Sequence, residues 1–255
     1  MTAADWGLLM VAAFGAGWVD AVVGGGGLIL LPAILVVAPG LSAQAALATN
    51  KMTAVFGTFA AVVTFSRKIA LDWRVMAPAG VLAAAASACG AAAVSLIDRD
   101  LFIPIIMVVL VGVAVLVTVR PTIGTATGNE PPTRRTFLTV VFLAAGAFGF
   151  YDGILGPGTG TFFIIAFAAF LGTEFVRSAA MAKVLNLGSN FGALIFFAVT
   201  GHVMWQLGAA MAVCNVVGAL LGSRTALSRG SGFVRIVLLV VVVCMVVRLG
   251  WQQFG

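Results

Sequence analysis

A glycine-broken apolar segment occurs twice in the chain, with corresponding residues 132 positions apart. The first copy begins at Gly17 and reads GWVDAVVGGGGLILLP, and the second begins at Gly149 and reads GFYDGILGPGTGTFFI. The same offset continues beyond the motif, apart from a one-residue slip at the glycines, and relates Asp20 to Asp152, Lys51 to Lys183, Phe65 to Phe197 and Trp73 to Trp205. A register that holds over this distance indicates an internal duplication.

Glycines in the middle of an apolar segment have a structural meaning. Glycine weakens a helix and permits backbone conformations that other residues avoid. In lipid, the N–H and C=O groups freed by a break are costly, so broken helices occur only where protein buries them or where they line a cavity. Two breaks at corresponding places in two halves are typical of a transporter's binding site. The alternative is close helix packing by small residues, which would not require the proline of GPGTG.

The composition places the chain in a membrane. Its 255 residues are 62% hydrophobic and 9% charged, and the mean hydropathy is +1.17, whereas soluble domains carry about 25% charged residues. Apolar runs reach the length of about 20 residues that a membrane-spanning helix needs. The net charge of +6 does not indicate nucleic acid binding, because most basic residues fall in short loops between apolar runs, where membrane orientation explains them.

The apolar runs divide into two sets with the same plan. Each set begins with a broken pair of arms, at residues 6–38 in the first and 137–171 in the second. Three full spans follow in each half, at residues 43–65, 75–97 and 101–119 and at residues 174–199, 207–222 and 233–251. A polar stretch rich in Pro, Thr and Gly separates the halves. We therefore predict three regions, namely a first repeat at 1–119, a cytoplasmic linker at 120–135 and a second repeat at 136–255.

Loop charges predict how the repeats are oriented. The basic loop 66–74 corresponds to an uncharged loop around His202, and the acidic turn 98–100 corresponds to a basic stretch at 223–232. Basic loops face the cytoplasm, so equivalent loops lie on opposite sides and the repeats are inverted. Inversion needs an odd number of crossings per half, which three spans supply if the broken arms form a re-entrant hairpin. The predicted fold class is an all-α integral membrane protein with two inverted repeats, each a glycine-broken, re-entrant segment plus three transmembrane helices.

Charged residues deep within the apolar segments indicate a binding site. They form two repeat-related sets, Asp20 with Lys51 and Asp152 with Lys183, and each charge must face a cavity or a partner because it is costly in lipid. Amides and hydroxyls lie near both lysines, and the helix ends at the breaks add N–H groups that favour an anion. We predict a small-anion site near the midplane, with Asp20 and Asp152 as coupling or ion-pair residues and with substrate-binding residues Gly24, Gly25, Gly26, Gly27, Thr49, Asn50, Lys51, Gly156, Gly158, Thr159, Lys183, Asn186 and Asn190.

A purely structural role is the alternative for these charges, in which two Asp–Lys pairs would fix each broken segment to a span. The sequence does not show which acid each lysine faces. The simplest test of a purely structural role replaces the acid and the lysine of one repeat together, as in Asp20→Asn with Lys51→Ala or Asp152→Asn with Lys183→Ala. His202, the single histidine, is predicted to be a solvated loop residue. One histidine provides no pair of metal ligands and no support for Ser-His-Asp catalysis. We therefore predict no enzyme, no metal site and no cofactor.

The residues around the two breaks and the two lysines resemble the sulfite exporter TauE/SafE family of bacterial membrane permeases. The likeness rests on D-A-x-x-GGGG-L from Asp20, A-x-x-TNK ending at Lys51, YDGxxGPGTG from Tyr151 and K-x-LN from Lys183, and it spans nearly the whole chain. The resemblance implies a multi-pass protein of the bacterial cell (inner) membrane that transports small sulfur-containing anions, such as sulfite, thiosulfate, sulfoacetate or related organosulfonates. It does not fix the substrate, because members of the family differ.

The membrane potential favours export. With the inside negative, moving one anionic charge outward releases about 2.3 kcal/mol per 100 mV, so export runs without a coupling ion. Uptake needs one, with Asp20 or Asp152 as its natural carrier. The alternatives are a permease or channel for another small solute, such as a carboxylate or a metal cation, and a coupled importer of a sulfur oxyanion. The expected partners are a small anionic substrate and the lipid bilayer, without nucleic acid, and a homo-oligomer stays open.

Overall fold

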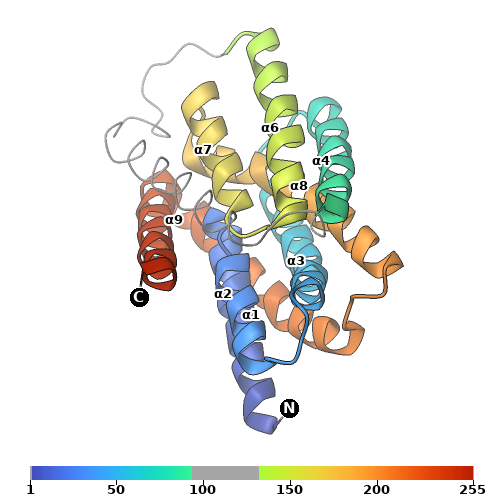
Figure 1. The fold of residues 1–255 in the computed structure, drawn as a ribbon. Coiled ribbons are helices and arrows are strands. Elements are labelled where there is room, and N and C mark those ends of the chain that lie inside the picture. Colours follow the sequence, from blue (N-terminus) through green and yellow to red (C-terminus); the bar gives the residue numbers. More distant parts are fainter. Residues whose placement is uncertain (1, 94–131, 255) are drawn as a thin grey trace.

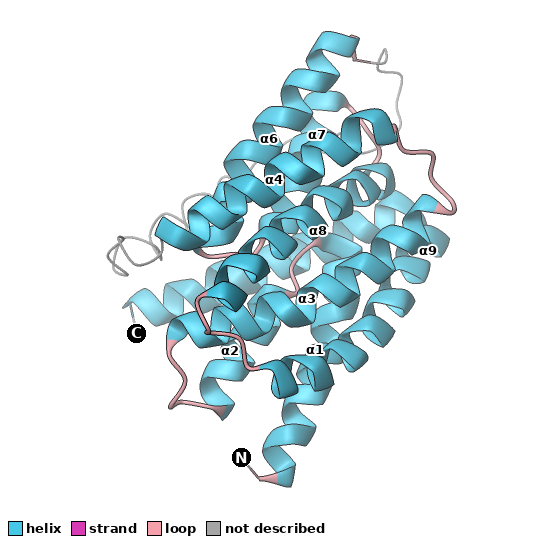
Figure 2. Ribbon diagram, turned by 90° about the vertical axis from the view of Figure 1, so that its right-hand side faces the viewer, coloured by secondary structure: helices cyan, strands magenta, loops and turns pink. Residues whose placement is uncertain are grey.

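The computed structural model of the protein describes residues 2–93 and 132–254, in which every regular element is a helix (Figure 2). The first half contains α1 (Ala3–Val23), α2 (Gly27–Val37), α3 (Ala43–Ser66) and α4 (Trp73–Ala93). The second half contains α6 (Arg134–Ile154), α7 (Thr159–Leu171), α8 (Phe175–Val199) and α9 (Trp205–Phe254). Within these two ranges six helices are long and apolar enough to cross a membrane, which confirms the predicted all-α membrane fold. The predicted span 101–119 and the acidic turn 98–100 lie outside the described residues.

A glycine ends the helix before the first break, and a glycine begins the helix after the second. Gly24 has a φ of 79°, and its N–H donates to the Asp20 carbonyl at 2.7 Å, which closes α1 with a left-handed cap. At the second break Gly158 has a φ of 85° immediately before α7. Both positions use a backbone conformation that residues with a side chain rarely adopt.

A threonine cap sets the start of α6. The helix begins at Arg134, inside the stretch 120–135 that the sequence predicts as a linker. The Thr133 hydroxyl accepts the N–H of Thr136 at 3.2 Å and so satisfies a backbone group at the helix start. The cap extends the helix beyond the apolar run. Residues 120–131 of the predicted linker lie outside the described part of the chain.

The predicted loop at 223–232 is too long, because helical residues fill most of it and the break between the two helical parts of α9 is confined to Gly230. Ser223 Oγ donates to the Leu220 carbonyl at 3.2 Å, and Thr225 Oγ1 donates to the Leu221 carbonyl at 2.7 Å. These bonds satisfy the polar side chains within the helix, so a polar composition does not end it. The helix is interrupted only at Gly230, where φ is 76° and ψ is −173°.

The two glycine-broken pairs of helices meet in the middle of the molecule from opposite ends. In Figure 1, α1 rises from the N-terminus at the bottom and α2 returns downward, whereas α6 descends from the top and α7 returns upward. α1 contacts α2 and α6 contacts α7, as expected for two hairpins. The breaks touch each other, because a side chain at Gly24 would collide with the backbone of Gly160. Polar groups of both breaks are therefore brought to one place.

The two halves pack across each other and do not form separate bundles. α1 packs on α9, α4 packs on α6, and α3 packs on α8. Close backbone contacts recur at the repeat offset, since Gly17 lies against the carbonyl of Asn215 and its counterpart Gly149 lies against the carbonyl of Ala83. Each half therefore uses the other as its main packing partner.

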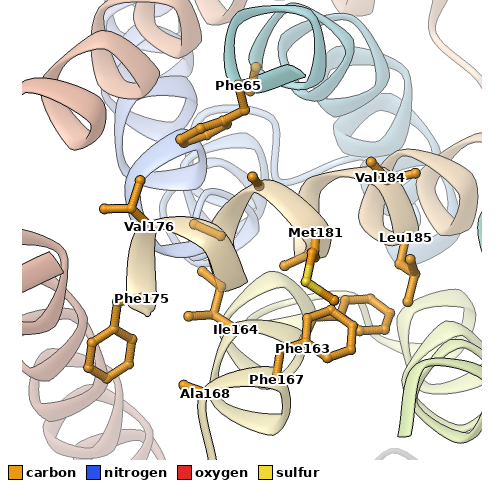
Figure 3. Packing of buried hydrophobic residues seen from close by; sticks show 14 of the residues in the cluster. Phe65, Phe163, Ile164, Phe167, Ala168, Phe175, Val176, Met181, Val184 and Leu185 are labelled. Atoms are coloured by element: carbon orange, nitrogen blue, oxygen red, sulfur yellow. The ribbon is translucent and has the colours of Figure 1, made fainter. Parts of the chain in front are cut away.

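An apolar core lies where α3, α7 and α8 meet. Phe65 of α3 and Phe163 and Phe167 of α7 are fully buried there (Figure 3). On the outside of the molecule, Val81 is 70% exposed and Val199 is 84% exposed, as suits a surface that lipid tails cover. The core holds α3 and α8, which are the two helices that carry the buried lysines.

Candidate functional site

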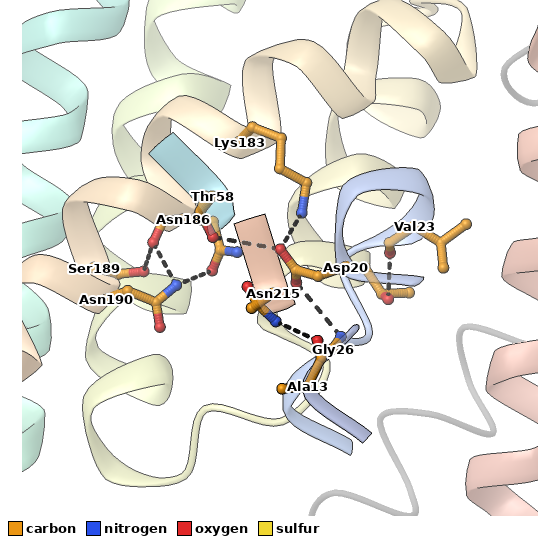
Figure 4. Close-up of polar contacts among 11 residues, drawn as sticks. Ala13, Asp20, Val23, Gly26, Thr58, Lys183, Asn186, Ser189, Asn190 and Asn215 are labelled. Carbon is orange, nitrogen blue, oxygen red and sulfur yellow. Dashed lines mark hydrogen bonds and ion pairs between the residues drawn. The ribbon is translucent and has the colours of Figure 1, made fainter. Parts of the chain in front are cut away.

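Two buried ion pairs cross between the halves of the molecule. Lys51 Nζ of α3 lies 2.8 Å from Asp152 Oδ1 of α6. Lys183 Nζ of α8 lies 2.9 Å from Asp20 Oδ2 of α1, as Figure 4 shows. Each lysine therefore binds the acid of the other repeat. A pairing within each repeat, as the simplest double substitutions assume, is wrong.

Burial makes these charges depend on each other. The Lys51, Lys183 and Asp152 side chains are at most 2% exposed, and that of Asp20 is 16% exposed. An ammonium or carboxylate without a partner would be strongly disfavoured in such a medium, and each pair cancels one charge of each sign. The two sets of buried charges are thus neutral overall in this conformation.

The glycine breaks create the space for the lysine end groups. Asp152 lies near the end of α6, and Gly156 follows it with a φ of 84°. A side chain at Gly156 would begin 2.8 Å from Lys51 Nζ. Because Gly156 has no side chain, there is room for the Lys51 ammonium beside Asp152.

A small cavity lies between the charged residues and the two breaks. Its volume is about 20 Å³, which is room for about one or two water molecules. The sequence predicted every lining residue except Ala54 and Gly160. The lining residues are Asp20, Gly24, Gly27, Asn50, Lys51, Ala54, Asp152, Gly156, Gly160, Asn186 and Asn190.

Some predicted site residues lie beside the cavity and do not line it. Lys183 reaches the cavity wall through its ion pair with Asp20. The Gly26 N–H donates to Asp20 Oδ1 at 3.4 Å and so helps to position that acid. Thr49 Oγ1 donates to the Ala45 carbonyl at 2.7 Å and accepts the N–H of Met204 at 3.4 Å, which connects α3 to the start of α9.

The remaining predicted residues shape the breaks. Gly158 precedes α7 in a left-handed conformation, and the Thr159 hydroxyl donates to the Gly156 carbonyl at 2.8 Å. Gly25 faces the side chains of Val19 and Val241. These three positions hold the backbone of the breaks, whereas the cavity wall comes from their neighbours.

Helical spacing could have revealed residues that the prediction omitted. Ala54 follows Lys51 by three residues and Thr58 follows it by seven, so both share its face of α3. Ala54 lines the cavity, and the Thr58 hydroxyl donates to Asp20 Oδ2 at 3.4 Å (Figure 4). Gly160 is the last glycine of the GPGTG motif, and its contact with Gly24 depends on how the two breaks meet.

Asparagines give the cavity a polar wall. Asn190 Nδ2 donates to the Asn186 carbonyl at 2.8 Å and to Asn186 Oδ1 at 3.2 Å (Figure 4). Asn50 is 5% exposed and also lines the cavity. An amide both donates and accepts hydrogen bonds, so this wall suits an oxyanion or another polar solute.

Two helix N-termini also reach the cavity. Gly27 is the first residue of α2, and Gly160 lies in the first turn of α7. The start of a helix presents backbone N–H groups and the positive end of the helix dipole. Two helix starts are therefore added to a balanced set of two ammonium groups and two carboxylates at or beside the cavity, and they supply hydrogen-bond donors that an anion could use.

The fold and the site define a class of protein. A buried polar cavity between two glycine-broken helix pairs, within a bundle of membrane-spanning helices, is the architecture of a membrane transporter. The chain belongs to the sulfite exporter TauE/SafE family, whose model matches residues 9–249. It is a multi-pass bacterial membrane protein.

Curated bacterial proteins resemble the chain over almost its full length. A Sinorhizobium sp. protein described as "Probable membrane transporter protein ORF9" is 34% identical over 242 residues, which cover 94% of this chain and 90% of that protein. The Escherichia coli K12 "Probable membrane transporter protein YfcA" is 33% identical over 250 residues, which cover 98% and 91%. A Haemophilus influenzae "Probable membrane transporter protein" is 30% identical over 251 residues, which cover 97% and 96%. No solved structure matches the chain.

Proposed function

We propose that this transporter moves small sulfur-containing anions, such as sulfite or organosulfonates, with export as its direction. The substrate binds near the membrane midplane, where the two halves meet. The observation that carries the proposal is the pair of buried lysines, Lys51 and Lys183, beside one cavity between two glycine breaks. The family description supports the sulfur chemistry.

The two acids occupy the place that a substrate anion would take. Sulfite and sulfonate groups, like carboxylates, carry oxygens that accept charge-assisted hydrogen bonds from an ammonium group. The cavity of about 20 Å³ has no room for such a group while both pairs are closed. Binding therefore requires at least one pair to open, and the substrate then replaces a carboxylate as the partner of a lysine.

An inverted repeat is part of this proposal. α1 and α6 correspond at the repeat offset, yet they enter the molecule from opposite ends (Figure 1). The contacts of Gly17 and Gly149 with the opposite half are also reciprocal. Both observations support two repeats, 1–119 and 136–255, related by a two-fold axis in the membrane plane. Such a pair can expose one central site to either side in turn.

Flux measurements on the purified full-length protein in proteoliposomes test the proposal. Vesicles are loaded with sulfite, thiosulfate, sulfoacetate, acetate or a divalent metal salt, and the membrane potential is set with potassium and valinomycin. We expect efflux of at least one sulfur anion above that of empty vesicles. An inside-negative potential should increase it, because the potential drives anions outward.

A loop cation provides the matched control for these measurements. Lys51→Ala and Lys183→Ala should reduce sulfur-anion flux strongly, whereas Lys68→Ala, at an exposed position between α3 and α4, should not, because solvent and salt screen its charge. Preferred transport of acetate or of the metal cation would support the alternative of a permease for another solute. The absence of flux for every sulfur anion would contradict the proposal.

A further inference from the structure

The two acids of the site differ in how well their oxygens are satisfied. Asp20 accepts hydrogen bonds on both oxygens, from Lys183 at 2.9 Å, from the Thr58 hydroxyl at 3.4 Å and from the Gly26 N–H at 3.4 Å. Asp152 accepts one from Lys51 on Oδ1 at 2.8 Å. Its Oδ2 is buried and has no hydrogen-bond partner in the part of the chain that the structure describes.

The sequence explains this asymmetry. At the repeat offset of 132, the counterpart of Thr58 is Asn190. Asn190 directs its amide to Asn186, at 2.8 Å and 3.2 Å, and not to Asp152. The second half therefore lacks the hydroxyl that supports Asp20 in the first half. Asp152 lines the cavity, and its buried Oδ2 keeps no partner among the described residues.

A bare, buried carboxylate oxygen leaves one acceptor position of the acid unfilled. A buried charge is stable only when its hydrogen bonds and its countercharge are complete. Protonation of Oδ2 would remove the negative charge and turn this oxygen into a hydrogen-bond donor for an incoming anion. Asp20 has hydrogen-bond partners on both oxygens and so offers no comparable unfilled position.

The charge balance of the cavity connects a proton to the substrate. Two carboxylates and two ammonium groups are neutral together, so an anion that enters alone brings an uncompensated charge into a poorly solvated place. Protonation of Asp152 leaves one positive charge in excess. That charge is the Lys51 ammonium, which then has no carboxylate partner and is free for the anion.

We propose that Asp152 takes up one proton whenever an anion binds. The Lys51 ammonium then exchanges its partner Asp152 for the anion, and the proton and the anion cross the membrane together. This inference rests on the proposed function. The proton comes from water on the side to which the site is open and bonds to Asp152 Oδ2, and the Lys51 hydrogen bond moves from Oδ1 to an oxygen of the anion. After the anion leaves, the proton returns to water and the ion pair closes.

Few other charged or titratable groups face Asp152. Lys51 comes from α3, Asp20 from α1 and Lys183 from α8, and the last two bind each other. On α6 itself, the neighbouring Tyr151 hydroxyl donates to the Pro157 carbonyl at 2.9 Å. The described residues of α4 and α9 contribute no lining group to the cavity. For a dianion, one net negative charge still crosses with the proton, so an inside-negative potential still favours export.

Coupled proton and anion fluxes test this inference. The full-length protein is reconstituted in vesicles that contain a pH-sensitive dye, and [35S]thiosulfate is added outside. Thiosulfate does not titrate near neutral pH, so any proton movement above that of empty vesicles belongs to the protein. We expect internal acidification that accompanies tracer entry with about one proton per anion. Asp152→Asn should abolish both acidification and net entry and retain only exchange of thiosulfate for thiosulfate, because an amide cannot release a proton.

Two variants make the result specific. Asp152→Glu should restore proton movement, and the repeat counterpart Asp20→Asn should keep the ratio of protons to anions even if its flux is slower. Tracer entry without acidification in the natural protein, or acidification that persists in Asp152→Asn, would overturn the coupling and leave the proposed function intact. The absence of protein-dependent tracer movement, together with no flux of the other sulfur anions, would overturn both proposals.

Discussion

Each buried lysine binds an acid from the other half, and this crossing decides how substitutions combine. Removing one member of a buried ion pair leaves an uncompensated charge and costs about 3–5 kcal/mol, whereas removing both members leaves none. The crossed pairs in this transporter are Lys51 with Asp152 and Lys183 with Asp20. A lysine and an acid from the same repeat are therefore not expected to compensate for each other.

Double substitutions should show this crossing directly. Lys51→Ala should lower the melting temperature of the detergent-purified protein, and addition of Asp152→Asn should recover most of the loss. Addition of Asp20→Asn instead should lower the melting temperature further, because two buried charges then lack a partner. Recovery with Asp20→Asn, but not with Asp152→Asn, would contradict the observed pairing.

Transport by the same variants separates the two roles of the lysine. If Lys51 binds the substrate, the matched double variant should be stable but should transport sulfur anions poorly, since no ammonium remains for the anion. If the lysine only neutralises Asp152, transport should return with stability. Full recovery of flux in Lys51→Ala/Asp152→Asn would exclude Lys51 as an anion ligand.

The sequence identified the charged residues but not their partners. Asp20, Lys51, Asp152 and Lys183 stand out because charges are rare deep in apolar segments. The repeat offset relates them equally well whether the pairs form within a repeat or between repeats. Only the positions of the side chains in the folded molecule distinguish the two pairings. The repeat offset shows that Asn190 replaces Thr58 in the second half, but it does not show that the Asn190 amide turns to Asn186 and leaves Asp152 Oδ2 without a partner among the described residues.

At the scale of helices, apolar runs and glycines predicted most elements correctly. Polar composition led to one wrong prediction, that of a long loop at residues 223–232. Both broken helix pairs occur where GGGG and GPGTG indicated them. The polar stretch 223–232 was predicted to be a loop, although its hydroxyls bond to carbonyls of the same helix and only Gly230 leaves the helical conformation. Serine and threonine are compatible with a helix when they are bonded in this way.

The contact between the two breaks should be sensitive to a single methyl group. Gly160 lies in α7 with no positive φ, yet a Cβ there would begin 2.5 Å from Gly24 Cα. Gly160→Ala should therefore destabilise the protein by about 1–3 kcal/mol, as overpacking does, and should reduce flux. Thermal melting and proteoliposome flux measure the two effects.

A second helical glycine controls for helix propensity. Gly146 lies in α6, and nothing lies within 4 Å of a Cβ placed there. Gly146→Ala gains the same helix propensity, up to about 1 kcal/mol, without the collision, so its melting temperature should be unchanged or higher. Equal behaviour of the two variants would show that the contact between the breaks does not limit packing.

For the whole molecule, the internal repeat predicted more than any single motif did. The offset of 132 relates contacts as well as residues: Gly90 lies against Phe150, and its counterpart Gly222 lies against Trp18. Such reciprocity is what a two-fold relation between the halves produces. The direction of the repeats in the membrane depends on loop charges and stays a prediction, since the acidic turn 98–100 lies outside the described residues.

Cysteine labelling tests the inverted topology. After Cys89, Cys214 and Cys244 are replaced by serine, new cysteines are introduced at two exposed basic positions by Lys68→Cys and Arg229→Cys. An impermeant maleimide should label both only from the cytoplasmic side, because basic segments remain inside. His202→Cys, in the turn between α8 and α9, should be labelled from outside. Labelling of the first two positions from opposite sides would contradict the inverted model.

The crossed ion pairs also give the molecule the interface of a symmetric dimer. In such an interface the same surface serves both subunits, so that residue i of one contacts residue j of the other and the reverse contact is made as well. Lys51 with Asp152 and Lys183 with Asp20 meet this description when the halves are treated as subunits. A half alone would expose a lysine and an acid that have no partner. On the proposed inverted topology, an ancestral half-length chain with these residues would have functioned only as two copies inserted in opposite orientations, and fusion of the genes would have preserved their contacts.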